Sequence, residues 1–146
     1  MIALGSDHAG IEYKESLKKL LPEIGFTYND FGTFSSASVD YPDFAHTVSE
    51  AVVSGTYEYG ILICGTGIGM SIVANKHKGI RAAACESVMA AQLARDHNNA
   101  NILCLGARIT RWETAEEMVK MFLTTPFSGG ERHLCRIQKI HELTNL

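Results

Sequence analysis

The chain of 146 residues lacks the features that mark several classes of protein. Its four cysteines stand 21, 19 and 31 residues apart, so no Cys-x-x-Cys pair predicts a structural zinc site or a redox dithiol. The longest apolar runs, such as residues 61–64, have the length of a strand and are far too short to span a membrane. The first residues show no basic region and no long apolar segment, so we expect a cytoplasmic protein without a secretory signal.

Charge and composition narrow the class further. Thirteen Lys and Arg residues stand against 16 Asp and Glu, a formal net charge of −3, which predicts no broad basic surface for nucleic acid. With 46% hydrophobic and 20% charged residues, the composition is that of an ordinary globular protein. There is no internal repeat, low-complexity tract or linker, so we expect a single domain over residues 1–146.

Strand-like and helical patterns alternate along the chain. The strand-like runs cover residues 2–6, 27–31, 61–64, 80–85 and 102–105. Helical patterns cover residues 11–21, 42–55, 87–97, 113–123 and 131–143, and one helix follows the glycines at 65–69 and reaches about residue 76. This alternation predicts a Rossmann-like three-layer α/β sandwich, a five-stranded parallel sheet with helices on both faces. Five strands suit the flavodoxin-like order 2-1-3-4-5, although a sequence does not fix strand order.

Ligands of such sheets bind beyond the carboxyl ends of the strands, where the strand order reverses. In the expected order this point lies between the first and third strands. Asp7 and His8 follow the first strand, and Cys64 begins a glycine-rich segment after the third, residues 64–69, here called the Cys64 loop. The sequence therefore predicts a pocket at this place.

Three glycines give the Cys64 loop a possible use. Gly65, Gly67 and Gly69 let the backbone approach a ligand closely and direct several N–H groups toward it. The helix N-terminus that follows favours an anion, either a bound phosphate or an oxyanion formed during a reaction. A tight strand-to-helix turn, with glycines chosen for packing, explains the same pattern equally well.

Better known loops do not fit this segment. Met70 stands where a Gly-x-Gly-x-x-Gly dinucleotide fingerprint needs its third glycine, and the loop follows the third strand instead of the first. A low-molecular-weight cysteine phosphatase would need arginine at the same position. No P-loop pattern occurs, and a response-regulator receiver would need aspartate in place of Cys64.

Cys64 is the cysteine whose place suggests chemistry. It ends a strand against a helix N-terminus and faces backbone N–H groups, a setting that favours the thiolate as a base or nucleophile. The alternative is a buried thiol without a chemical role, since cysteine is common in protein cores. We interpret Cys85, Cys104 and Cys135 as small hydrophobic residues.

Among the histidines, His8 and His97 are the informative ones. His97 lies in the polar segment 95–99 at the end of the fourth helix, where it can act as an acid or simply cap the helix. No spacing of His, Asp and Glu predicts a metal site, and we expect none. The other histidines are interpreted as surface residues: His46, His77, His133 and His141.

Arginines form a third candidate group. Arg132 and Arg136 are four residues apart on the last helix and project from one face. Together with Arg108, just beyond the fifth strand, they can clamp a phosphate through charge-assisted hydrogen bonds. A solvated basic face without a ligand explains the same spacing.

These residues resemble a known family, the type B ribose-5-phosphate isomerases, which include the galactose-6-phosphate isomerase subunits. The similarity spans essentially the whole chain, and Arg108, Arg132 and Arg136 fall where the family has its phosphate-binding arginines. Some members have another base in place of the cysteine, whereas this chain keeps Cys64. The resemblance rests on Asp7-His8, Ser38-Val39-Asp40-Tyr41-Pro42, Cys64-Gly65-Thr66-Gly67-Ile68-Gly69-Met70-Ser71, Ala74-Asn75-Lys76 and His97-Asn98.

The resemblance implies an aldose–ketose isomerase of the non-oxidative pentose phosphate pathway, which interconverts ribose 5-phosphate and ribulose 5-phosphate without metal or cofactor. His97 would open the furanose ring, while Asp7 and Thr66 hold or move protons at the reactive end. The Cys64 thiolate would carry the proton from C2 to C1 through a cis-enediolate. The implied substrate contacts are the backbone of Gly65, Thr66, Gly67, Ile68 and Gly69 for the enediolate, His8, Arg108, Arg132 and Arg136 for the phosphate, and Asn98 and Tyr41 for the hydroxyls.

The resemblance also implies an assembly, since family members are at least dimers with a pocket shared between subunits. We therefore expect a homodimer or tetramer in which His97, Asn98 and Arg108 come from one chain and the Cys64 loop from its neighbour. The C-terminal helix, about 131–146, would pack on the partner. Two alternatives remain: an isomerase of a hexose 6-phosphate (allose or galactose 6-phosphate), and a sugar-phosphate-binding protein without catalysis.

Overall fold

The computed structural model describes residues 1–146, the whole chain. Five parallel strands alternate with helices, as the sequence predicts. The strands are β1 (Ile2–Ser6), β2 (Tyr28–Asp30), β3 (Tyr59–Cys64), β4 (Ala82–Ala84) and β5 (Ile102–Gly106). The helices are α1 (Ile11–Glu23), α2 (Tyr41–Val53), α3 (Ile68–Ala74), α4 (Val88–Asn98), α5 (Trp112–Thr124) and α6 (Glu131–Thr144).

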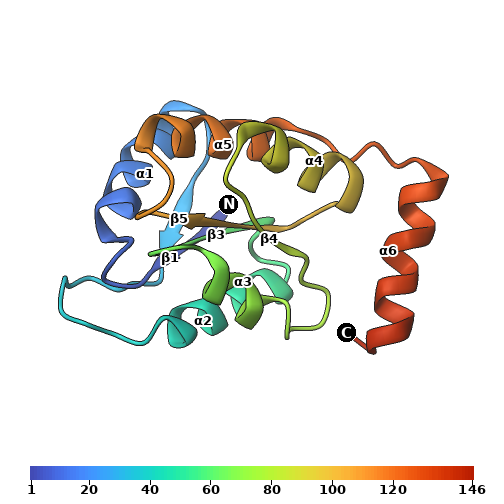
Figure 1. Cartoon of the computed structure of the whole chain (residues 1–146), viewed down its shortest axis with the longest axis horizontal. Helices are drawn as coiled ribbons and strands as arrows, with labels where there is room; N and C mark the ends of the chain where they lie inside the picture. Colours follow the sequence, from blue (N-terminus) through green and yellow to red (C-terminus); the bar gives the residue numbers. More distant parts are fainter.

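The sheet is the middle of three layers, with α1, α4 and α5 on one face and α2 and α3 on the other (Figure 1). Each face has its own apolar core, because strands buried on both sides direct alternate side chains to opposite faces. Leu4, Ile63 and Leu103 pack under α1, α4 and α5, while Leu62 and Ile102 pack under α2 and α3. The predicted three-layer α/β sandwich is confirmed.

The suggested strand order is wrong for the last two strands, because the order is β2-β1-β3-β5-β4. All five residues of β5 are buried, and β5 pairs with β3 over five positions, from Gly60↔Ile102 to Cys64↔Gly106. The three alanines of β4 are half-buried or exposed. A short strand with little apolar surface is suited to the sheet edge, whereas an apolar strand gains more from a neighbour on each side. The reversal point still lies between β1 and β3.

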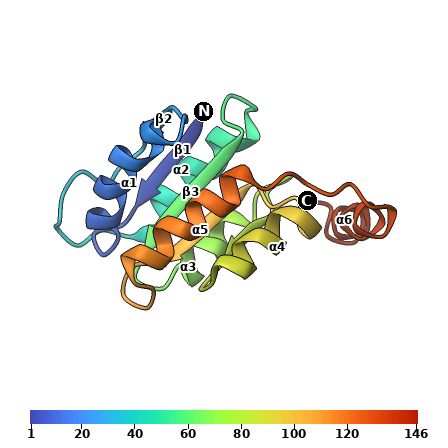
Figure 2. The ribbon, with the colours of Figure 1, turned by 90° about the horizontal axis from the view of Figure 1, so that it is seen from above.

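Helix α6 projects from the side of the sandwich, beyond α4 and β4 (Figures 1 and 2). None of its residues is buried, and Leu134, Ile140 and Leu143 are at least 48% exposed. In this single chain its apolar side chains therefore lack most of the cover that such a helix needs. None of the helices combines the length and the apolar character that crossing a membrane requires.

Candidate active site

The Cys64 loop folds around the sulfur of Cys64. Cys64 is the last residue of β3 and is only 5% exposed, and the backbone N–H of Gly67 donates a hydrogen bond to its Sγ at 3.1 Å. Gly67 has φ +76°, and a Cβ atom there would lie 3.0 Å from the carbonyl carbon of Leu105. Because α3 begins at the next residue, the N–H of Gly69 in its first turn has no helical partner and is free for a ligand. This geometry suits a sulfur that carries negative charge.

Tyr41 covers the far end of the loop. It is the first residue of α2, and its ring carbons would lie 2.6 and 2.7 Å from a Cβ atom on Gly69. Glycine is therefore required at position 69 so that the tyrosine can lie against the loop. Thr66, between Gly65 and Gly67, is exposed, and its Oγ1 accepts the N–H of Ile68 at 3.3 Å, which leaves the hydroxyl proton available.

Arg108 lies beside the same loop. Its backbone N–H donates to the carbonyl of Gly65 at 2.9 Å, and its Nη1 would lie 3.5 Å from a Cβ atom on Gly65. The expectation that Arg108 joins His97 and Asn98 on the other side of a shared pocket is therefore wrong. Because β5 is the direct neighbour of β3, the residues that follow β5 reach the Cys64 loop of their own chain.

Asp7 and His8 stand at the end of β1, next to β3. Asp7 is buried, and its Oδ1 accepts the N–H groups of Ala9 at 2.9 Å and Gly10 at 3.1 Å, so it fixes the turn into α1. The Nδ1 of His8 accepts the N–H of Val39 at 3.2 Å. Since an N–H group can only donate, the neutral His8 ring carries its proton on Nε2, which is left to bond a ligand.

His97 and Asn98 lie at the opposite edge of the sheet. They end α4, and a helix that connects parallel strands runs back toward their amino ends, as Figure 2 shows for α4. The Cys64 loop follows the carboxyl end of β3, so the length of β5, about 17 Å, separates the two groups. Within one chain, His97 and Cys64 therefore do not share a pocket.

A second group surrounds His97 instead. The His97 ring stacks on His133 of α6, with centroids 4.3 Å apart and planes at 12°, and its Nε2 lies 3.3 Å from Oδ2 of Asp96. A hollow of about 340 Å³ is lined by His97, Asn98, His133 and Arg136. Arg132, one turn away, is exposed and does not line it. The structure thus brings Arg136, but not Arg132, to His97.

His133 was missed by sequence reasoning, which interprets it as a surface residue. Loss of hydration, then the positive charges of His97 and Arg132, lower the pKa of His133, so its ring is neutral near neutral pH. A neutral ring can stack on the ring of His97 without adding a positive charge to this group. The only signal in the sequence is the place of His133 between Arg132 and Arg136.

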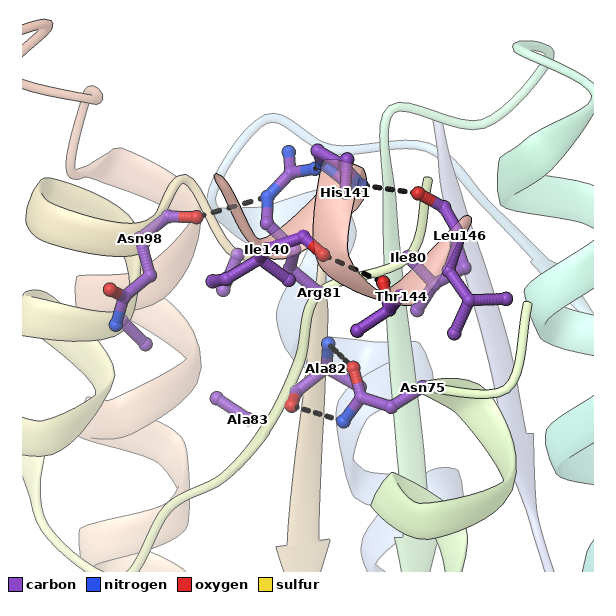
Figure 3. A pocket seen from close by; sticks show the side chains of 12 residues that line it. Asn75, Ile80, Arg81, Ala82, Ala83, Asn98, Ile140, His141, Thr144 and Leu146 are labelled. Carbon is purple, nitrogen blue, oxygen red and sulfur yellow. Dashed lines mark hydrogen bonds between the residues drawn. The ribbon is translucent and has the colours of Figure 1, made fainter. Parts of the chain in front are cut away.

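Another cavity of about 340 Å³ lies between β4, the end of α4 and α6 (Figure 3). Arg81 crosses it, and its Nε donates to the carbonyl of Asn98 at 3.0 Å while its Nη1 lies 3.2 Å from Nε2 of His141. Below it, Asn75 exchanges two hydrogen bonds with the backbone of Ala82. Arg81 therefore ties α6 to the helix end that carries His97, and Asn75 fixes the start of β4.

Comparisons with known proteins agree with this fold. The family model described as Ribose/Galactose Isomerase matches residues 2–140. Ribose-5-phosphate isomerase B of Escherichia coli is 45% identical over 139 residues, which cover 95% of this chain and 93% of that protein. D-erythrulose-4-phosphate isomerase of Pectobacterium atrosepticum is 44% identical over 130 residues, 88% of this chain and 86% of that protein.

Among solved structures, ribose-5-phosphate isomerase B of Clostridium thermocellum superposes with a TM-score of 0.96 and 47% identity, covering 99% of this chain and 97% of that one. Near-complete coverage in sequence and structure leaves no large segment of either chain unmatched. The chain therefore belongs to the ribose/galactose isomerase family and is an isomerase.

Proposed function

We propose that the protein interconverts ribose 5-phosphate and ribulose 5-phosphate through a cis-enediolate. The observation that carries this proposal is the buried Sγ of Cys64, which accepts the N–H of Gly67 at the N-terminus of α3. A thiolate held in this way is placed to act as a base. Two relatives that are 45% and 47% identical carry the name ribose-5-phosphate isomerase B, which supports the five-carbon substrate.

In the proposed reaction Cys64 removes the proton from C2 of the open-chain aldose and returns it to C1. Negative charge then develops on the substrate oxygens of the enediolate, and backbone N–H groups of residues 65–69 stabilise it. Asp7 and Thr66 hold or move protons between those oxygens. Each step transfers a proton and neither step changes the oxidation state of the protein, so the reaction as proposed needs no cofactor.

The phosphate is proposed to bind where one histidine and several arginines can donate hydrogen bonds to it. His8, through its Nε2 proton, and the exposed Arg108 approach from the side of the Cys64 loop. Arg136 and Arg132 of α6 approach from the other side, and charge-assisted hydrogen bonds from arginine are well suited to phosphate. Tyr41 and Asn98 are proposed to contact the hydroxyls.

The separation of the two groups within one chain is the reason to propose a shared site. His97 opens the furanose ring by giving a proton to the ring oxygen, so it must lie within hydrogen-bonding distance of the sugar bound at Cys64. A second copy can supply His97, Asn98 and Arg136 to the Cys64 loop, Tyr41 and Arg108 of the first. The exposed apolar side chains of α6 give a homodimer or tetramer a surface to bury, and residues 1–146 then form one sugar-phosphate isomerase domain per chain.

Two other substrate lengths use the same chemistry. A hexose 6-phosphate is the first alternative, and the named activity of the Pectobacterium relative adds a four-carbon ketose phosphate. A binding protein without catalysis would not need a sulfur with an N–H donor beside the substrate, so this function is the least favoured of the alternatives.

The test is turnover of ribose 5-phosphate by the wild type and Cys64→Ala, with and without a chelator, beside the four- and six-carbon phosphates. We expect chelator-resistant turnover that Cys64→Ala abolishes through kcat. Arg108→Ala should instead raise KM about ten- to a hundredfold, because it removes a charged hydrogen bond to the phosphate. Activity on a hexose 6-phosphate alone would show that the six-carbon sugar is the substrate and would leave the mechanism unchanged. Full activity of Cys64→Ala would refute the role of Cys64 as the base.

A further inference from the structure

Three potential ligands meet on the face of the sheet that α2 and α3 cover, outside the proposed active site. His46 and Glu50 lie one turn apart on α2, and His77 lies in the turn after α3. Nδ1 of His46 is 2.7 Å from Nε2 of His77, which is 3.6 Å from Oε1 of Glu50. The interpretation of His46 as a surface residue is confirmed, since it is exposed, whereas the side chain of His77 is only 12% exposed and lies against His46.

The orientation of His77 matters for what this cluster can bind. Its Nδ1 lies 3.1 Å from the carbonyl oxygen of Val73 and 3.2 Å from that of Ala74. Because carbonyl oxygens only accept, Nδ1 carries the proton, and the lone pair of Nε2 points toward His46 and Glu50. Histidines that bind metals are held in the same way, with the second ring nitrogen donating to a carbonyl or carboxylate. The His77 side chain is only 12% exposed, which keeps this orientation.

We propose that His46 Nδ1, His77 Nε2 and a carboxylate oxygen of Glu50 bind a divalent transition-metal ion of the zinc type. The three ligand atoms lie within 4.8 Å of one another. Bonds of about 2.0–2.1 Å in a tetrahedron place neighbouring ligand atoms about 3.3 Å apart. The two nitrogens must therefore separate by about half an ångström, which the exposed His46 allows. Two imidazoles with one carboxylate favour Zn²⁺, Co²⁺ or Ni²⁺ over Mg²⁺ and Ca²⁺, and water completes the coordination.

Such an ion would join two helices that lead to the Cys64 loop. Helix α2 begins with Tyr41, which lies over Gly69, and α3 begins directly after Gly67. His77 follows the other end of α3, which has seven residues and a length of about 10 Å. The ion would fix the spacing of α2 and α3 without entering the reaction, and its binding should therefore raise the Tm of the protein.

The experiment uses tag-free, chelator-treated protein with Cys135→Ser, which removes the exposed thiol as a competing ligand. Co²⁺ is titrated while the visible d–d bands are recorded, and the Tm is measured with Zn²⁺. We expect one equivalent of Co²⁺ per chain without a thiolate charge-transfer band. The Tm should rise by about 5–10 °C at a Zn²⁺ concentration one hundred times Kd.

His46→Gln and Glu50→Gln change exposed side chains and should each weaken Co²⁺ binding at least tenfold. The matched control is Glu23→Gln, which removes an exposed carboxylate at the end of α1 and should leave the titration unchanged. The proposal is overturned if no ion binds at stoichiometric concentration. It is equally overturned if His46→Gln and Glu50→Gln bind Co²⁺ as the control does, because the ion then occupies other ligands.

Discussion

Replacing Gly67 by alanine would disturb the Cys64 loop at its contact with β5 while leaving the sulfur in place. The new Cβ would lie 3.0 Å from the carbonyl carbon of Leu105 and 3.2 Å from that of Cys104, both of them backbone atoms in the centre of the sheet. Gly55 offers a matched control. It has φ +78° against +76° for Gly67, yet a Cβ atom there would meet nothing within 4 Å.

The structure gives the magnitude of each change. A left-handed backbone costs an L-residue about 1–2 kcal/mol, and both variants carry this cost. Gly67→Ala adds about 1–3 kcal/mol for overpacking, because backbone atoms of a paired strand move with difficulty. The total of about 2–5 kcal/mol corresponds to a Tm lowered by about 4–20 °C, against about 2–8 °C for Gly55→Ala. The difference between the variants measures the contact between the loop and β5.

Activity provides the second readout. A loop that moves away from β5 also moves its N–H groups from the substrate oxygens that they are proposed to stabilise, and loss of one such preorganised donor can cost about 10²–10³ in kcat. We expect kcat of Gly67→Ala to fall at least about tenfold, since the donor is displaced rather than removed. Gly55→Ala should keep the wild-type kcat. Equal Tm and equal kcat for the two variants, measured by calorimetry and by the turnover assay, would refute this account of the loop.

Two further predictions concern stability. Lys14 is fully buried, and its Nζ lies 2.7 Å from Oδ1 of Asp30. Lys14→Ala should therefore lower the free energy of unfolding, measured in urea, by about 3–5 kcal/mol. A loss below about 1 kcal/mol would contradict this prediction, because it would show that water replaces the amine freely. Burial raises the pKa of the Cys85 thiol to about 11 in the folded chain. Between pH 9 and 11 the thiol therefore stays protonated in the folded chain, whereas in the unfolded chain, where its pKa has the ordinary value of 9.0, it ionises. The free energy of unfolding should therefore fall between pH 9 and 11, with about 3 kcal/mol of the loss due to Cys85, and it should fall less steeply for Cys85→Ala. The same dependence on pH for both proteins would contradict the raised pKa of Cys85.

The alternation of strands and helices was predictable because each element follows a local periodicity. The order of β4 and β5 was not, since it depends on how much apolar surface each strand buries when the sheet is complete. The three-residue β4 covers only half of the six predicted positions, 80–85, because Ile80 and Cys85 are buried by packing outside the sheet pairing. Local patterns thus predict that a strand exists better than they predict which strands it pairs with.

The residues of the candidate site likewise divide into those that local sequence patterns indicate and those that depend on the complete fold. Cys64 and the glycines directly follow the end of β3, and rules about strand ends find such groups, whereas Tyr41 was indicated only by the family resemblance. Arg108 was assigned to the wrong group because its place depends on β5 lying next to β3. The contacts of His133 with His97, and of His77 with His46, join residues 36 and 31 positions apart, so no spacing in the sequence could indicate them.

Solvent exchange at the substrate tests the central claim, that Cys64 is the base that moves the proton between C2 and C1. Ribose 5-phosphate is incubated in D₂O with the wild type, with Cys64→Ala and with Cys85→Ala, a buried-thiol control, and deuterium in the substrate and product is followed by NMR. We predict that deuterium enters with the wild type and Cys85→Ala, and that Cys64→Ala shows no exchange while still binding the phosphate. Exchange by Cys64→Ala at the wild-type rate would contradict the account, because another group would then carry the proton.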